Sequence, residues 1–151
     1  MGTLFHLSEI LKFAIEKEEE AERLYENLSS EAATSELQIF FAGLAQEEEG
    51  HKKFYESMMQ ATAKWSQSED TEEYESYMRE LIKISRTAIA PTDFSNARLV
   101  LDYAIAREKD SVLLYAGLIN YVPPADRKGI YAIVQEEVKH AAMLTRIKET
   151  I

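Results

Sequence analysis

The sequence predicts an all-α fold, a four-helix bundle with a long crossover between its second and third helices. Apolar residues recur at alternating spacings of three and four, the pattern of a helix that buries one face. Only 5 Gly and 3 Pro are spread over 151 residues, so few positions interrupt long helices. Residues 65–94 separate two pairs of helices that are each joined by a short turn. The length suits a single domain, residues 1–151.

The first two helices are expected at residues 8–30 and 34–64. Ser8 is a suitable N-cap for the first helix, and the serine-rich stretch 29–35 separates it from the second. Gly50 interrupts the second helix, and we expect a close helix crossing or a local bulge there. We call the residues of a helix that are expected to face the bundle interior its inward seam. The seam of the first helix is Leu7, Leu11, Ala14, Glu18, Ala21, Tyr25 and Leu28. The seam of the second helix is Leu37, Phe41, Leu44, Glu48, His51, Tyr55 and Met58.

The last two helices are expected at residues 95–121 and 124–149. Pro91 precedes the third helix. Pro123 and Pro124 end it and open the fourth, where a proline in the first turn costs little. The two inward seams are Leu101, Ala104, Glu108, Ser111, Tyr115, Leu118 and Val122, and Ile130, Ile133, Glu137, His140, Leu144 and Ile147.

The crossover, residues 65–94, is expected to contain a further short amphipathic helix. A connection of this length can run back along the bundle, at about 1.5 Å per helical residue. Such a crossover is the arrangement of ferritin-like bundles and not of simple up-down bundles. Each pair of helices joined by a short turn is expected to be antiparallel. The apolar residues with helical spacing in the crossover are Tyr74, Tyr77, Met78, Leu81, Ile82, Ala88 and Ile89.

An internal repeat relates the two halves of the chain. The pattern of residues 14–25 recurs about 90 residues later in residues 104–115, and Glu47–His51 recurs in Glu136–His140. The helix pairs 8–64 and 95–149 therefore resemble duplicated halves.

Composition excludes several classes of protein. The absence of Cys rules out disulfide scaffolds, thiolate metal sites and thiol catalysis. A net charge of −10 disfavours binding to nucleic acid or to an anionic membrane surface. No apolar run approaches the ~18 residues of a membrane-spanning helix, and the first residues lack the pattern of a signal peptide. We therefore expect a cytoplasmic protein.

Six polar residues occupy inward seams where the helical period demands apolar side chains. An uncompensated buried carboxylate costs several kcal/mol, and four of them together repel one another. No Lys or Arg lies on an inward seam to neutralise them. A metal is the obvious compensator. The six residues are Glu18, Glu48, His51, Glu108, Glu137 and His140.

Charge and spacing both suggest two metal ions. Four carboxylates with two neutral imidazoles balance two divalent cations. The i,i+3 pairs Glu48–His51 and Glu137–His140 each face one way on a helix. A lone Glu on each of two helices, with Glu-x-x-His on each of the other two, is the ligand set of di-iron and di-manganese carboxylate bundles. These ligands suit Fe(II) or Mn(II), and imidazole also permits zinc.

At these motifs the sequence resembles the rubrerythrin-related branch of the ferritin-like superfamily. The matching motifs are Ala14-Ile15-x-x-Glu18 with Tyr25, Leu44-Ala45-x-Glu47-Glu48-x-x-His51, Ala104-Ile105-x-x-Glu108 with Tyr115, and Glu136-Glu137-x-x-His140. The resemblance implies that Glu48 and Glu137 pair with the histidines at the two metals. It also implies that Glu18 and Glu108 complete or bridge those metals.

The seams place two tyrosines two turns beyond the lone glutamates. Tyr25 and Tyr115 are expected to hydrogen-bond carboxylates on neighbouring helices, or to quench radicals.

The sequence departs from rubrerythrins proper at two features. It lacks the cysteines of their rubredoxin-like domain, so electrons are expected from a separate donor such as a rubredoxin-like protein. Ser111 stands where the family has an extra glutamate, and Ala21 is its counterpart in the first helix. These small residues leave room for peroxide or dioxygen, or simply allow close helix packing. The family's peroxidase mechanism therefore does not carry over unchanged.

The leading hypothesis for function is a di-iron oxidoreductase that reduces hydrogen peroxide or reacts with dioxygen. Two ferrous ions supply the two electrons that reduce peroxide to water. One alternative is ferroxidase activity with iron storage or buffering, which needs a cage-like oligomer. Another is a structural module that keeps its metal only for folding. A homodimer is expected from the resemblance.

Overall fold

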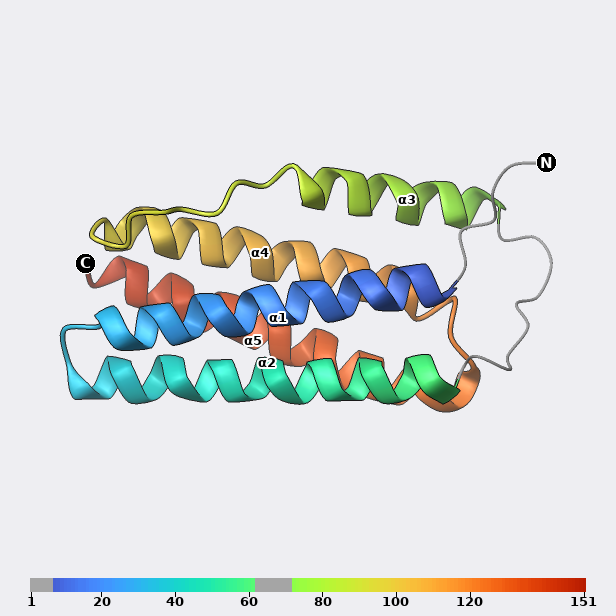
Figure 1. Ribbon diagram of the computed structural model, residues 1–151, viewed down its shortest axis with the longest axis horizontal. Helices are drawn as coiled ribbons and strands as arrows, with labels where there is room; N and C mark the ends of the chain where they lie inside the picture. The colour runs from blue at the N-terminus through green and yellow to red at the C-terminus, as the bar shows by residue number, and fades with distance from the viewer. Residues whose placement is uncertain (1–6, 62–71) are drawn as a thin grey trace.

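The computed structural model describes residues 7–61 and 72–151, and every regular element in these two stretches is a helix (Figure 1). The first pair comprises α1 (Leu7–Glu31) and α2 (Ser35–Ala61). The second comprises α4 (Ala97–Leu118) and α5 (Arg127–Glu149). The all-α bundle with a long crossover is therefore confirmed. None of the described helices has the length and apolar character needed to cross a membrane.

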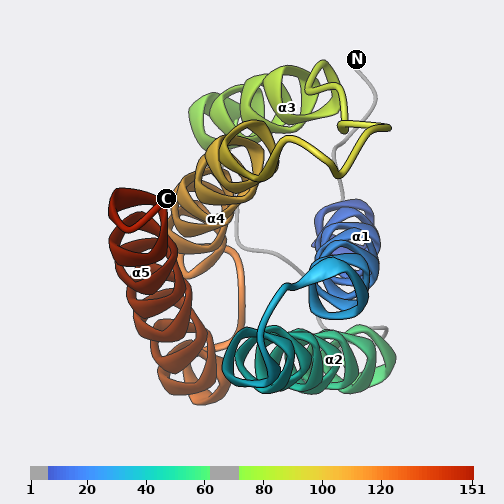
Figure 2. The same ribbon diagram turned by 90° about the vertical axis from the view of Figure 1, so that its left-hand side faces the viewer.

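The described part of the crossover, from α3 (Glu72–Arg86) to the start of α4, runs along the bundle as predicted (Figure 1). Its helix α3 lies beside α4, on the side away from α5 (Figure 2). Met78 and Ile82 are the buried apolar residues that α3 contributes to the core. Gly117 of α4 makes this packing possible, because a Cβ there would lie 2.5 Å from the Met78 sulfur.

The predicted extent of the crossover helix is wrong at its C-terminal end. Ala88 and Ile89 lie beyond the helix, and Ile89 is 88% exposed. The helix ends because the backbone N–H and the hydroxyl of Thr87 both donate to the Ile84 carbonyl, at 3.1 and 2.6 Å. Tyr77 is about half-exposed, at 48%.

The other helix boundaries agree with the sequence to within a few residues. Asn96 caps α4, since its side chain accepts a hydrogen bond from the Leu99 N–H at 3.2 Å. A short 3-10 turn, η2 (Pro124–Asp126), precedes α5, so the predicted proline start is a 3-10 turn rather than α-helix. The predicted end of the second helix at residue 64 lies outside the described residues.

The core consists of two apolar clusters with a polar layer between them. In α1 the first cluster contains Ile10 and Leu11, and the second contains Leu24 and Leu28. Glu18 lies between the two, and the same order of apolar, polar and apolar residues recurs in the other three long helices. The polar layer is thus held from both ends by packed side chains, which restricts movement of the charged groups within it.

Candidate metal centre

All six polar residues of the inward seams meet in this middle layer. Each is at most 5% exposed. The neighbouring glutamates in the sequence are all at least partly exposed, namely Glu19, Glu20, Glu47, Glu49 and Glu136. Glu18 comes from α1 and Glu108 from α4, while α2 and α5 each contribute a Glu-x-x-His pair. The helical spacing of an acidic sequence therefore predicts which of its glutamates are buried.

The six residues form two overlapping groups of four. In each group, one ligand atom from every residue lies within 4.8 Å of the others. Glu48 and Glu137 belong to both groups, whereas Glu18 and Glu108 belong to one each. The sequence left open whether Glu18 and Glu108 complete or bridge the metals. The geometry favours Glu48 and Glu137 as the shared pair. The groups are Glu18, Glu48, His51 and Glu137, and Glu48, Glu108, Glu137 and His140.

Each histidine lies closer to the glutamate of the opposite helix than to the one in its own motif. His51 Nδ1 is 2.8 Å from Glu137 Oε1 and 3.9 Å from Glu48 Oε2. His140 Nδ1 is 2.9 Å from Glu48 Oε1. The two Glu-x-x-His motifs therefore interlock across α2 and α5, an arrangement that spacing within one helix does not reveal.

Unpaired buried atoms provide the test of whether these residues fit a metal. Each of the six contributes one buried atom that has no hydrogen-bond partner among the described residues. Short contacts without hydrogen-bond geometry are expected when lone pairs converge on a common point. Buried polar atoms seldom remain unsatisfied, so a shared cation is the simplest partner for them. The six atoms are Glu18 Oε2, Glu48 Oε1, His51 Nδ1, Glu108 Oε2, Glu137 Oε1 and His140 Nδ1.

Two further carboxylates, to which the seam pattern assigns no role, contact the histidine rings from outside. His140 Nε2 lies 2.6 Å from Glu47 Oε2, and His51 Nε2 contacts Glu136. A carboxylate on Nε2 fixes the ring and leaves Nδ1 free to bind a metal. The signal was present in the repeat, because each motif begins with two consecutive glutamates.

The two seam tyrosines also pair crosswise, which confirms the predicted hydrogen bonds. Tyr115 of α4 donates to Glu18 Oε1 of α1 at 2.6 Å, and Tyr25 of α1 donates to Glu108 of α4. Burial, followed by the charge of the nearby carboxylates, raises the pKa of both tyrosines well above the usual value. Both therefore remain protonated donors at neutral pH. Their predicted role in quenching radicals stays a prediction.

Without metal, the polar layer retains protons. Although burial opposes the charge, the carboxylates of Glu137 and Glu18 raise the pKa of His51 to about 11. Burial and neighbouring carboxylates also raise the pKa of Glu48 and of Glu137 well above the ordinary value. Protons on Glu48, Glu137 and His51 thus relieve the repulsion among the four buried carboxylates of the metal-free protein.

A small cavity adjoins the second group of ligands. Ala21 and Ser111 line it together with Tyr25, Glu108 and Glu137. The volume open to the centres of water-sized molecules is about 20 Å³, which suffices for a molecule of that size. The small residues at these two positions therefore leave space beside the carboxylates, the first of the two readings of the sequence.

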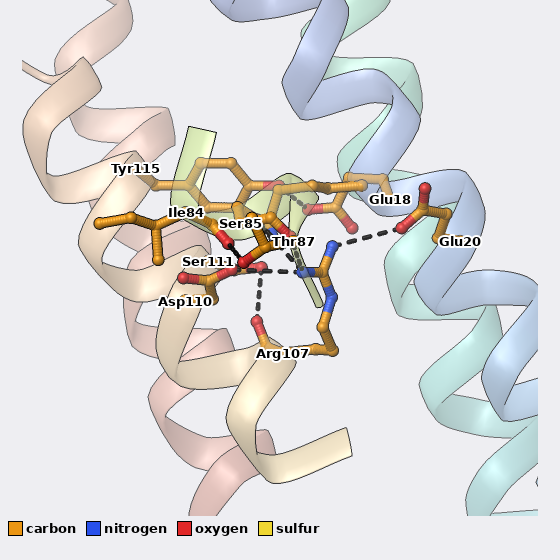
Figure 3. A network of polar contacts seen from close by, with 10 residues as sticks. Glu18, Glu20, Ile84, Ser85, Thr87, Arg107, Asp110, Ser111 and Tyr115 are labelled. Carbon is orange, nitrogen blue, oxygen red and sulfur yellow. Dashed lines mark hydrogen bonds and ion pairs between the residues drawn. The ribbon is translucent and has the colours of Figure 1, made fainter. Parts of the chain in front are cut away.

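Glu20 and Arg107, which also line this cavity, belong to a network of polar contacts (Figure 3). Arg107 bonds Glu20 at 3.2 Å and Asp110 at 3.3 Å. Lys17 is buried although it lies off the seam, and its ammonium contacts Asp110 at 3.4 Å and Ser85 Oγ at 3.2 Å. Burial first, and then the Arg107 charge, lower the pKa of Lys17. Lys17 therefore pairs with Asp110 and leaves the six central residues uncompensated.

Comparison with known proteins agrees with this geometry. The sequence profile of the rubrerythrin family matches residues 9–148. The chain belongs to the rubrerythrin family. A crystal structure from Thermotoga maritima, designated a ferritin-like diiron-carboxylate protein, superposes with a TM-score of 0.70 at 28% sequence identity. The similarity covers 99% of this chain and 98% of that one. No match was found among curated proteins.

In this member of the rubrerythrin family, the buried Glu and His residues can hold one metal ion in each group. Three carboxylates and one imidazole surround each position. Hard oxygen donors with one nitrogen per metal match the preferences of Fe(II) and Mn(II).

Proposed function

We propose that this chain is a non-haem di-iron oxidoreductase that reduces hydrogen peroxide or reacts with dioxygen. The observation that carries the proposal is the set of six unpaired buried atoms, one from each Glu or His of the two overlapping groups. Membership of the rubrerythrin family supports iron rather than manganese or zinc as the metal.

The chemistry divides between the metal and the protein. A pair of bound ferrous ions supplies two electrons, the number required to reduce hydrogen peroxide to two molecules of water. Glu48 and Glu137, which belong to both groups, would help to hold both ions. Glu47 and Glu136 keep the imidazoles oriented with Nδ1 inward.

The surrounding side chains control what reaches the centre. Tyr25 and Tyr115 each occupy one oxygen of a terminal glutamate, which leaves the second oxygen of Glu18 and of Glu108 free. The cavity beside Ser111 admits a molecule of about the size of water. We infer that it admits peroxide or dioxygen and excludes larger oxidants.

Electrons for repeated turnover come from a separate protein in this proposal. A rubredoxin-like donor is the class that the sequence suggests, and a homodimer is the oligomer that it suggests. A dimer is too small to enclose a mineral core.

The test is to replace ligands and measure metal content together with peroxide consumption. Glu108→Ala and His51→Ala should lower bound iron and abolish peroxide turnover, because each removes a ligand from one group. Glu49→Ala is the matched control, since Glu49 is on the same helix as His51 and pairs with Lys53 at the surface. Unchanged turnover in the two ligand variants would contradict the proposal.

Iron storage is the competing function, and it predicts different measurements. Storage requires uptake of many iron atoms per chain and a large assembly in gel filtration. Our proposal predicts two irons per chain and a small oligomer.

A further inference from the structure

Tyr55 is a fully buried tyrosine whose hydroxyl has no hydrogen-bond partner among the described residues. Its side chain is 0% exposed, and its ring lies 5.0 Å from the ring of Tyr115. The Tyr115 hydroxyl, by contrast, donates to Glu18. In residues 7–61 and 72–151, seven buried side-chain nitrogen or oxygen atoms have no hydrogen-bond partner. Six of them belong to the candidate ligands, and the seventh is the Tyr55 hydroxyl.

The environment of Tyr55 places it at one group of ligands in particular. Tyr55 follows His51 by one helical turn on the same inward seam. After burial, the charges that raise the pKa of Tyr55 are those of Glu18, Glu137 and Glu48. These three carboxylates, with His51, form the first group.

The second half of the chain shows that the hydroxyl is not required for packing. The residue one turn after His140 is Leu144, which is also 0% exposed and belongs to an apolar cluster. The two halves match at their ligands but differ here, so the two metal positions have different surroundings.

An unpaired buried hydroxyl destabilises a folded protein, because the group gives up its hydrogen bonds to water. Phenylalanine would fill nearly the same volume without that penalty. Because the Tyr55 hydroxyl lowers the stability of the protein, it is a candidate for a role in function.

We propose that the Tyr55 hydroxyl is a hydrogen-bond donor for a small exogenous ligand bound at the Glu18–His51 position, such as water, peroxide or azide. The inference rests on the proposed di-iron centre. It makes Tyr55 a residue that distinguishes the two metal positions from each other.

The first experiment uses the metal-free protein. Tyr55→Phe should raise its melting temperature by about 2–4 °C, because the variant removes an unpaired hydroxyl. Tyr115→Phe should lower the melting temperature, since that hydroxyl bonds Glu18. Tyr131→Phe is the control at an exposed position and should leave it unchanged. A loss of stability in Tyr55→Phe comparable to that in Tyr115→Phe would overturn the proposal.

The second experiment uses the iron-loaded protein with azide as the probe, followed by its absorption spectrum. Tyr55→Phe should retain the wild-type iron content and bind azide about threefold to tenfold more weakly. Equal azide affinity, loss of iron from the variant, or no azide binding by the iron-loaded wild type would each overturn the inference. Failure of the wild-type protein to bind iron would instead overturn the proposed function, and the inference with it, while the metal-free experiment would still decide whether the Tyr55 hydroxyl is unpaired.

Discussion

At the scale of single residues, the site is built from crosswise pairs. His51 contacts Glu137 and His140 contacts Glu48, while Tyr115 bonds Glu18. The identity of the six buried Glu and His residues followed from their positions on the seams. Their partners across the bundle did not, because helical periodicity shows which way a side chain faces but not which residue it meets.

Removing the outer carboxylates should weaken metal binding. Glu47→Gln and Glu136→Gln each replace the charged carboxylate that contacts a histidine Nε2 by a neutral amide. We therefore expect metal affinity to fall about 10-fold to 100-fold. Competition with a chelator measures this. Glu49→Gln should bind as the wild type does, and an equal affinity in all three variants would show that the outer contacts do not support the ligands.

Filling the cavity should slow the reaction without removing the metal. Ser111→Leu places a larger side chain in the space beside Glu108, so we expect a several-fold slower reaction with peroxide at full iron content. Stopped-flow absorption on the iron-loaded protein gives the rate. Ala21→Val is a smaller change at another residue that lines the cavity, and it guards against misfolding of the leucine variant. Wild-type rates in both variants would show that peroxide does not reach the centre through this cavity.

At the scale of helices, local patterns predicted most of the architecture. Alternating spacings of three and four located the four long helices, and prolines and serines marked their ends. The crossover helix was less well predicted because Thr87 ends it through contacts with Ile84 that no apolar pattern reports. Burial of Lys17 was missed for a similar reason, since it depends on Ser85 from α3 and Asp110 from α4.

Two glycines should respond oppositely to alanine. The expected close crossing or bulge at Gly50 is absent, because the helix is continuous there and a Cβ would meet nothing within 4 Å. Gly50→Ala should therefore stabilise the protein by about 0.5–1 kcal/mol. Gly117→Ala should destabilise it, since its Cβ would lie 2.5 Å from the Met78 sulfur. Urea unfolding measures both, and a stabilising Gly117→Ala would show that α3 does not pack closely on α4.

At the scale of the whole molecule, two apolar clusters enclose a polar layer that is stable only when its charges are neutralised. Protons perform this role in the metal-free protein, and two divalent cations perform it in the proposed holoprotein. Charge alone led the sequence analysis of the seams to two ions, a number that stays a prediction. The sequence could not indicate that Glu48 and Glu137 are shared, because that depends on how the two halves of the chain meet.

Stability of the metal-free protein should fall as pH rises. The pKa of His51 is about 11 in the folded state and about 6.5 when unfolded, so the folded state binds more protons between these values. The raised pKa values of Glu48 and Glu137 act in the same direction. The contribution of His51 is complete below about pH 6.5 and is lost as pH rises toward 11.

Calorimetry between pH 6.5 and 9 tests this dependence. The melting temperature of the metal-free protein should decrease over that range. The metal-loaded protein should not show the decrease, because metal replaces the protons and binds more tightly as they become scarcer. A metal-free protein whose stability rises with pH would contradict the assignment of protons to the centre.

The most direct test of the central claim is the number of iron atoms bound per chain after anaerobic loading with Fe(II) and removal of excess metal. The two overlapping groups predict a plateau at two. The same experiment on Glu108→Ala should give fewer than two. Uptake far beyond two in the wild type would indicate storage, and uptake that stays near zero would contradict the di-iron centre itself.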